Sequence, residues 1–226
     1  MRLFVLSLIN KFHKVVYRLL KKVHNLNVSA LTTIYGGTGL LSALIFTGMS
    51  TIALALLYLL HGFFDAGLTA VVLALFGVSL YLSIFPPPLK WKRRGILGII
   101  FESANSWHAL SKNRSLLIRL GLSFFASAVA LTTTFYFIYN AIGASLSVSA
   151  VLIISSLGNI ANLVPITPGS LGVFDIVTIK APQMLGLDAA RSLAATLVFR
   201  VILFSWALAT GIPASLYLVR ILGKKA

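Results

Sequence analysis

Long uninterrupted apolar runs dominate this sequence of 226 residues. Four windows contain no charged residue: Leu40–Leu60, Ala66–Pro86, Leu120–Tyr139 and Val201–Val219. Each window is close to the ~20 residues that a helix needs to cross a bilayer. The pattern predicts an all-α fold, a polytopic bundle of membrane-spanning helices that forms a single transmembrane domain over residues 1–226.

Amphipathic and basic segments precede and separate these runs. Residues 1–27 place apolar and basic side chains on different faces of a helix, which predicts an N-terminal helix lying in the headgroup layer. The two spans in residues 40–86 end at three consecutive prolines, because proline lacks the N–H that a helix needs. Residues 87–115 predict a basic cytoplasmic loop, with an interfacial helix over residues 96–110.

Residues 116–222 carry the remaining spans and one interruption. Two shorter apolar pieces, Val148–Val164 and Leu171–Leu185, flank a stretch rich in proline and glycine. Backbone that cannot stay helical is costly in lipid unless protein or a wet cavity surrounds it. We therefore expect a broken helix pair over residues 148–186. The pattern leaves open whether these are two short spans or a re-entrant hairpin.

The basic residues are distributed unevenly along the chain. There are 19 Lys and Arg residues against 4 Asp and Glu, a net charge of +15. Most precede the first span, lie between the second and third spans or follow the last span, whereas the loops at 61–65 and 141–147 hold none. This asymmetry predicts a multi-pass protein of the cell membrane with both termini in the cytoplasm. It also argues for anionic or phosphate-bearing membrane lipids as partners and against nucleic acid.

The interrupted region is the candidate site. Pro168 and Gly169 are expected to stop one helix, and Ser170 is a suitable N-cap for the next, whose free N–H groups can receive an anion. Polar side chains on the preceding helix are expected to share a face with this helix start. The candidate residues for binding a lipid headgroup are Asn159, Asn162, Thr167, Gly169, Ser170, Gly172, Asp175 and Arg200.

Three ionisable residues lie within apolar segments: Asp175, Lys180 and Arg200. A charged side chain at bilayer depth is costly, so we treat each of these residues as a candidate functional residue. Arg200 lies too far into the last segment to reach the membrane surface easily, so we expect it to pair with Asp175 or with a lipid phosphate. The alternative is an ion pair that only locks two helices together. Lys180 and Arg191 are expected to reach the outer interface.

Other chemistry finds little support in the sequence. There is no cysteine, and the four histidines are dispersed without metal-ligand spacing. The acidic residues form no catalytic pair, and Ser170 lacks the nucleophile-elbow pattern. We therefore expect no enzyme activity, no metal and no cofactor. Small residues in the spans permit close packing, within one chain or in a homo-oligomer.

One family shares this order of residues. The stretch Pro165-x-x-Pro168-Gly169-Ser170-Leu171-Gly172-Val173-Phe174-Asp175, followed by Gly186 and Arg200, resembles the transmembrane (flippase) domain of the lysylphosphatidylglycerol synthetase family. The similarity extends over about Phe101–Gly211. The family pattern has a second glycine where this chain has Ser170, and a glutamate where it has Asp175. The latter exchange keeps the charge but shortens its reach.

The resemblance implies lipid translocation between leaflets. A stand-alone membrane member of the family that moves a phosphate-bearing lipid, with the broken helix pair as the headgroup site, is therefore the first hypothesis. The alternative is a non-catalytic membrane scaffold, or a partner subunit of a cell-envelope lipid or glycosylation system.

Overall fold

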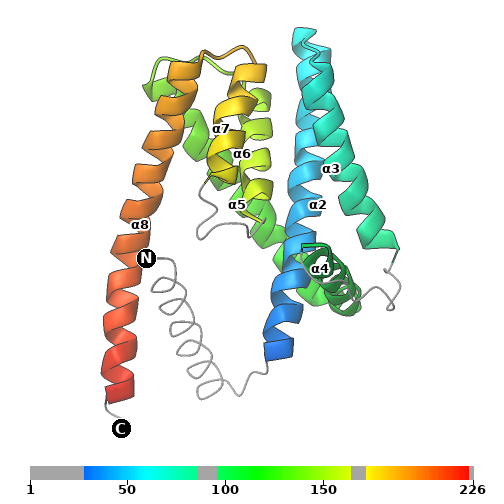
Figure 1. Ribbon diagram of the computed structural model, residues 1–226, viewed down its shortest axis with the longest axis vertical. Coiled ribbons are helices and arrows are strands. Elements are labelled where there is room, and N and C mark those ends of the chain that lie inside the picture. Colours follow the sequence, from blue (N-terminus) through cyan, green and yellow to red (C-terminus); the bar gives the residue numbers. More distant parts are fainter. Residues whose placement is uncertain (1–27, 86–95, 164–171, 224–226) are drawn as a thin grey trace. The chain divides into compact units, whose positions relative to one another are not determined.

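In the computed structural model, the residues that the structure describes (28–85, 96–163 and 172–223) form helices and no strands. The predicted N-terminal helix over residues 1–27 lies outside them. Figure 1 shows the helices, which are α2 (Val28–His61), α3 (Ala66–Ile84), α4 (Ile96–Leu110), α5 (Arg114–Ala141), α6 (Val148–Asn162), α7 (Val173–Met184) and α8 (Ala189–Gly223). The predicted all-α fold is confirmed.

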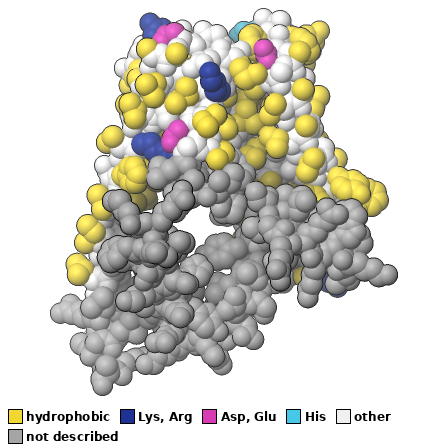
Figure 2. Space-filling view, viewed as in Figure 1, with side chains coloured by type: hydrophobic (Ala, Val, Ile, Leu, Met, Phe, Trp, Pro, Cys, Tyr) yellow, Lys and Arg dark blue, Asp and Glu magenta, His cyan; other side chains and the backbone are white. Residues whose placement is uncertain are grey.

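Four of these helices are long and apolar enough to cross a membrane. The candidate spans are Gly36–His61, Ala66–Ile84, Arg114–Ala141 and Ala189–Leu216, which agree with the four predicted runs. Hydrophobic side chains cover much of the described surface in Figure 2. Many large hydrophobic residues are exposed, and Trp206 is one of them. A surface of this kind suits contact with lipid chains rather than water.

The chain divides into two compact units. The first contains residues up to Leu44 together with Val78–Leu122. Within it, α4 packs closely on α2, because a Cβ atom on Gly36 would lie 2.9 Å from the Cα atom of Ser103. The Trp107 indole N–H also donates to the Ser83 carbonyl of α3 at 3.0 Å. The helix predicted over residues 96–110 is therefore present, packed against both neighbouring helices of this unit.

The second unit contains Ile45–Gly77 and residues from Ser123 onward, and it holds the main core. Helix α6 lies at its centre, since 9 of its 15 residues are buried. Within this core, the Thr132 and Ser155 hydroxyls lie 2.8 Å apart between α5 and α6. Such interhelical hydrogen bonds are worth about 1 kcal/mol in membrane bundles.

Acidic side chains cap the beginnings of α3 and α8. Asp65 Oδ1 accepts the Leu68 N–H at 2.6 Å ahead of α3, and Asp188 Oδ1 accepts the Arg191 N–H at 2.8 Å in α8. Each cap satisfies a backbone donor that the helix itself cannot pair, which stabilises by about 1 kcal/mol. Two of the 4 acidic residues in the sequence are thus used as helix caps.

Helix α7 ends at a glycine with a backbone conformation that other residues adopt poorly. Gly186 has φ +90°, its N–H donates to the Gln183 carbonyl at 3.1 Å, and the Leu187 N–H donates to the Pro182 carbonyl at 2.9 Å. This pair of bonds is a Schellman motif, in which a left-handed residue closes the helix. The family glycine noted in the sequence therefore has a structural reason.

We predict that Gly186→Ala lowers the stability of the protein by about 1–2 kcal/mol, because a Cβ atom is disfavoured in the left-handed region. Gly211→Ala is the matched control, since a Cβ there meets no atom within 4 Å and its helical backbone suits alanine. Thermal unfolding in detergent measures both. Equal stability of the two variants would contradict the role assigned to Gly186.

Candidate functional site

The first turn of α7 carries a carboxylate that accepts a hydrogen bond from the start of the same helix. Gly172 is the N-cap residue, with φ +97°, and Asp175 is the third residue of the helix. Asp175 Oδ2 accepts the Gly172 N–H at 3.1 Å. This is half of a capping box, because glycine has no side chain to complete the reciprocal bond.

The predicted N-cap was wrong. Ser170 was expected to start the helix, but α7 begins two residues later than that placement requires, after Gly172. The physical reason is that the positive φ of Gly172 breaks the helix there, while Asp175 stands at the N3 position that a capping box uses. The donors expected to receive an anion are thus partly used by Asp175 itself.

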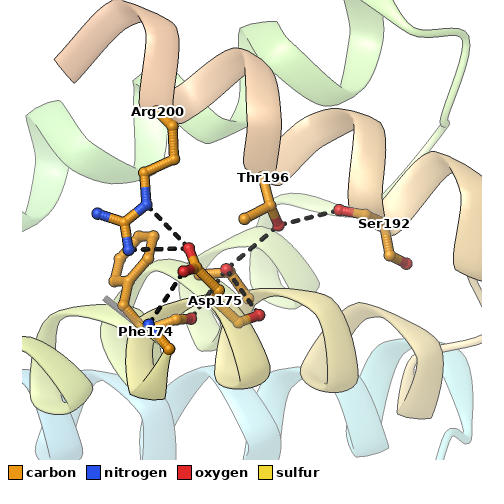
Figure 3. Close-up of polar contacts among 7 residues, drawn as sticks. Phe174, Asp175, Ser192, Thr196 and Arg200 are labelled. Atoms are coloured by element: carbon orange, nitrogen blue, oxygen red, sulfur yellow. Dashed lines mark hydrogen bonds and ion pairs between the residues drawn. The ribbon is translucent and has the colours of Figure 1, made fainter. Parts of the chain in front are cut away.

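The other carboxylate oxygen of Asp175 joins α7 to α8. Arg200 Nε donates to Asp175 Oδ1 at 2.8 Å, and Arg200 Nη2 lies 2.8 Å from the same oxygen (Figure 3). The side chain of Arg200 is 13% exposed and that of Asp175 is 32% exposed. The pairing that the sequence suggested is therefore present, and the acidic partner is the more open of the two.

Arg200 retains unused hydrogen-bonding capacity. Its Nη2 atom is buried and has no aligned hydrogen-bond acceptor among the described residues, although Asp175 Oδ1 lies close to it. The contact neutralises charge, but the same Asp175 oxygen also accepts from Arg200 Nε, so one oxygen serves two guanidinium nitrogens. A guanidinium carries five N–H donors, so this position can still donate to the oxygens of a further ligand.

Aromatic side chains hold the guanidinium in place. The Arg200 guanidinium carbon lies 4.8 Å from the centre of the Phe174 ring, a cation–π contact (Figure 3). Phe174 in turn stacks on Phe199 at 5.4 Å, and Phe199 stacks on Phe135 of α5 at 4.5 Å. The ion pair is therefore attached to a packed core that involves α5, α7 and α8.

Small and hydroxylated residues bring α6, α7 and α8 close together. A Cβ atom on Gly158 of α6 would lie 3.2 Å from both Phe174 and Thr178, so glycine allows this approach. The Thr196 hydroxyl oxygen lies 3.2 Å from the Thr178 hydroxyl oxygen and 3.0 Å from the Ser192 carbonyl oxygen, and its single proton can be donated to either. Sequence reasoning missed these residues. The spacing of Phe174 and Thr178, four apart on one helix face, was the available signal.

The described part of the chain brings only some of the predicted residues into this cluster. Asn159 is half-buried and Asn162 is exposed in the last turns of α6, and no hydrogen bond joins Asn159 to the ion pair. Thr167, Gly169 and Ser170 lie outside the described residues. Among the residues that the structure describes, no group of three His, Asp or Glu side chains is placed to hold a metal ion.

These features define a multi-pass helical membrane protein with a charged pair between two of its helices. The family described as the Lysylphosphatidylglycerol synthase TM region matches residues 15–211. The chain belongs to this family and is an integral membrane protein of it. The search of curated proteins gave no match, and neither did the search of solved structures.

We predict that Asp175→Asn destabilises the protein by about 2–3 kcal/mol, because it leaves Arg200 buried without a counter-charge. The double variant Asp175→Asn/Arg200→Met should recover most of that loss, since it removes the stranded charge. The control is Arg191→Gln, which removes an exposed pair with Asp188 at 3.4 Å and should cost less than about 1 kcal/mol. Chemical unfolding in micelles compares them. A double variant no more stable than Asp175→Asn would contradict the pairing energy.

Proposed function

We propose that this protein moves phosphate-bearing lipids between the leaflets of a membrane, with the Asp175–Arg200 pair as the headgroup site. Membership of the lysylphosphatidylglycerol synthase TM family supports a lipid-related role. The observation that carries the proposal is the Asp175–Arg200 ion pair itself, in which one carboxylate oxygen faces two guanidinium nitrogens at 2.8 Å and the side chain of Asp175 is 32% exposed.

The position of Arg200 along α8 supports a site at bilayer depth. Arg200 follows the first residue of α8, Ala189, by 11 residues, which is about 17 Å of helix. That distance is about half of a hydrocarbon core of roughly 30 Å. A charged residue at this depth faces the bundle interior or a wet cavity rather than lipid.

The lengths of α6 and α7 also support a break in the helices at bilayer depth. Helix α6 has 15 residues and α7 has 12, which correspond to about 22 Å and 18 Å. Both are shorter than the core thickness. We infer that α6 and α7 form a re-entrant pair rather than two complete spans.

The chemistry of the pair suits transient binding of a phosphate. A guanidinium binds phosphate through parallel N–H···O bonds, and Arg200 has donors to spare. Asp175 competes for the same guanidinium, so it keeps Arg200 neutralised when no lipid is present. This competition weakens phosphate binding, which a translocation site requires, because a headgroup held too tightly would not leave.

The proposed activity needs no covalent step. The site holds an ion pair, a backbone N–H and neighbouring hydroxyls, which bind and release a headgroup rather than cleave it. We propose that the protein acts without a cofactor and that both termini lie in the cytoplasm, as the distribution of basic residues indicates. Membrane lipids, anionic ones first, are its expected partners.

Reconstitution into liposomes with a fluorescent phospholipid tests this function. With the native protein, a membrane-impermeant reductant should bleach label from both leaflets, whereas empty liposomes lose only the outer label. Arg200→Gln should slow exchange at least about tenfold, the effect of losing ~1.4 kcal/mol of headgroup interaction. Asp175→Glu, which keeps the charge, should retain more exchange than Asp175→Asn.

Arg191→Gln is the control for this experiment, because Arg191 is an exposed cation of the same helix with its own partner. It should exchange lipid at the native rate. Native rates in both Arg200→Gln and the Asp175→Asn/Arg200→Met double variant would remove the proposed site. A native protein that exchanges no lipid would favour the scaffold alternative.

A further inference from the structure

An apolar groove lies on a different side of α7 from the ion pair. It is bounded by α3, α6 and α7 and has a volume of about 300 Å³. Its walls include Val71 from α3, Ile160 from α6 and Ile176 from α7. Lys180 is the one charged residue among those that line it.

The geometry of α7 separates the groove from the Asp175–Arg200 pair. Lys180 follows Asp175 by five positions, which is a rotation of about 140° around a helix with 3.6 residues per turn. Asp175 faces α8 and contacts Arg200, whereas Lys180 lines the groove against α3 and α6. The two features are therefore independent of each other.

The charge of Lys180 is not neutralised by a carboxylate within the described part of the chain. Its ammonium contacts only the neutral Gln183 Oε1 atom there, at 3.4 Å, and its side chain is exposed. Lys180 lies four residues before the end of α7 at Met184, about 6 Å along the axis. A lysine side chain is long enough to carry its ammonium over that distance, toward a headgroup layer at this end of the helix.

The apolar wall continues from Lys180 toward the start of α7. Lining residues run from Met184 back to Val173, a distance of about 16 Å along the helix. The groove is thus elongated, hydrocarbon-like along its length and cationic toward one end. This is the form of a single acyl chain attached to a negatively charged headgroup.

We propose that this groove is a binding site for one anionic phospholipid, whose acyl chain lies against α3, α6 and α7 and whose phosphate pairs with Lys180. Charge complementarity selects an anionic lipid, because the ammonium has no acidic partner among the described residues. The volume is in the range of small-ligand sites, which bury mostly apolar ligand surface. The site does not depend on lipid translocation.

Native mass spectrometry of the full chain tests the charge. The protein is reconstituted into membranes that contain equal amounts of phosphatidylglycerol and phosphatidylcholine of the same chain length. It is then released from these membranes in the mass spectrometer, and the lipids that remain bound to it are identified. We expect about fivefold enrichment of phosphatidylglycerol, which corresponds to the ~1 kcal/mol that one basic residue contributes near an anionic surface. Lys180→Gln should abolish the enrichment, and Lys180→Arg should keep it. Arg191→Gln, the control at another exposed cation, should also keep it.

A second pair of variants tests the groove itself. Val71→Trp places an indole in the groove, and Val78→Trp makes the same change at another exposed valine of α3 that does not line it. Val71→Trp should reduce retained lipid of both kinds at least about threefold, whereas Val78→Trp should leave it unchanged.

Three results would overturn the proposal: no preference in the native protein, an unchanged preference in Lys180→Gln, or unchanged retention in Val71→Trp. These results are independent of the exchange assay. Loss of exchange in Arg200→Gln with normal lipid retention tests only the headgroup site. Loss of retention in Lys180→Gln tests only the groove.

Discussion

An arginine in the middle of a membrane-spanning helix must find a counter-charge inside the protein, and this requirement organises the second unit of the fold. Arg200 pairs with Asp175 and lies over the ring of Phe174, which stacks on Phe199. Without that contact, α8 would carry an isolated charge at hydrocarbon depth, which costs several kcal/mol by the lower estimates. The packing of α7 against α8 therefore also supplies the counter-charge that Arg200 needs.

The same carboxylate performs two tasks through its two oxygens. Oδ2 closes the first turn of α7 on Gly172, and Oδ1 faces Arg200. A change at Asp175 therefore affects the start of α7 and the link to α8 together. Arg200 also carries more N–H donors than the one Asp175 oxygen that faces it can accept, so the pair is neutral in charge while donors remain for another ligand. An incomplete site of this kind suits a ligand that brings its own acceptors, as a phosphate does.

Helix α7 presents different chemistry on its two sides. One side carries Asp175 and contacts α8, and the other carries Lys180 and the apolar wall shared with α3 and α6. The proposed translocation site and the proposed lipid groove therefore share a helix but no residues. A short helix with a glycine at each end, Gly172 and Gly186, separates the two environments.

The sequence alone determined the class of the protein. Charge-free runs of about 20 residues can only be stable across a bilayer or in a large core, so the spans and the all-α fold followed from hydropathy and length. The Asp175–Arg200 pair was also open to prediction, because few charged residues lie within the apolar segments and a buried one favours a partner of opposite charge. The tertiary structure alone decided that Gly172 rather than Ser170 caps α7, because that depends on backbone dihedral angles. It alone placed Gly158 against Phe174, and Lys180 in a groove whose walls come from three helices. Contacts between segments distant along the chain leave no periodic signal in the sequence, because packing rather than local pattern selects them.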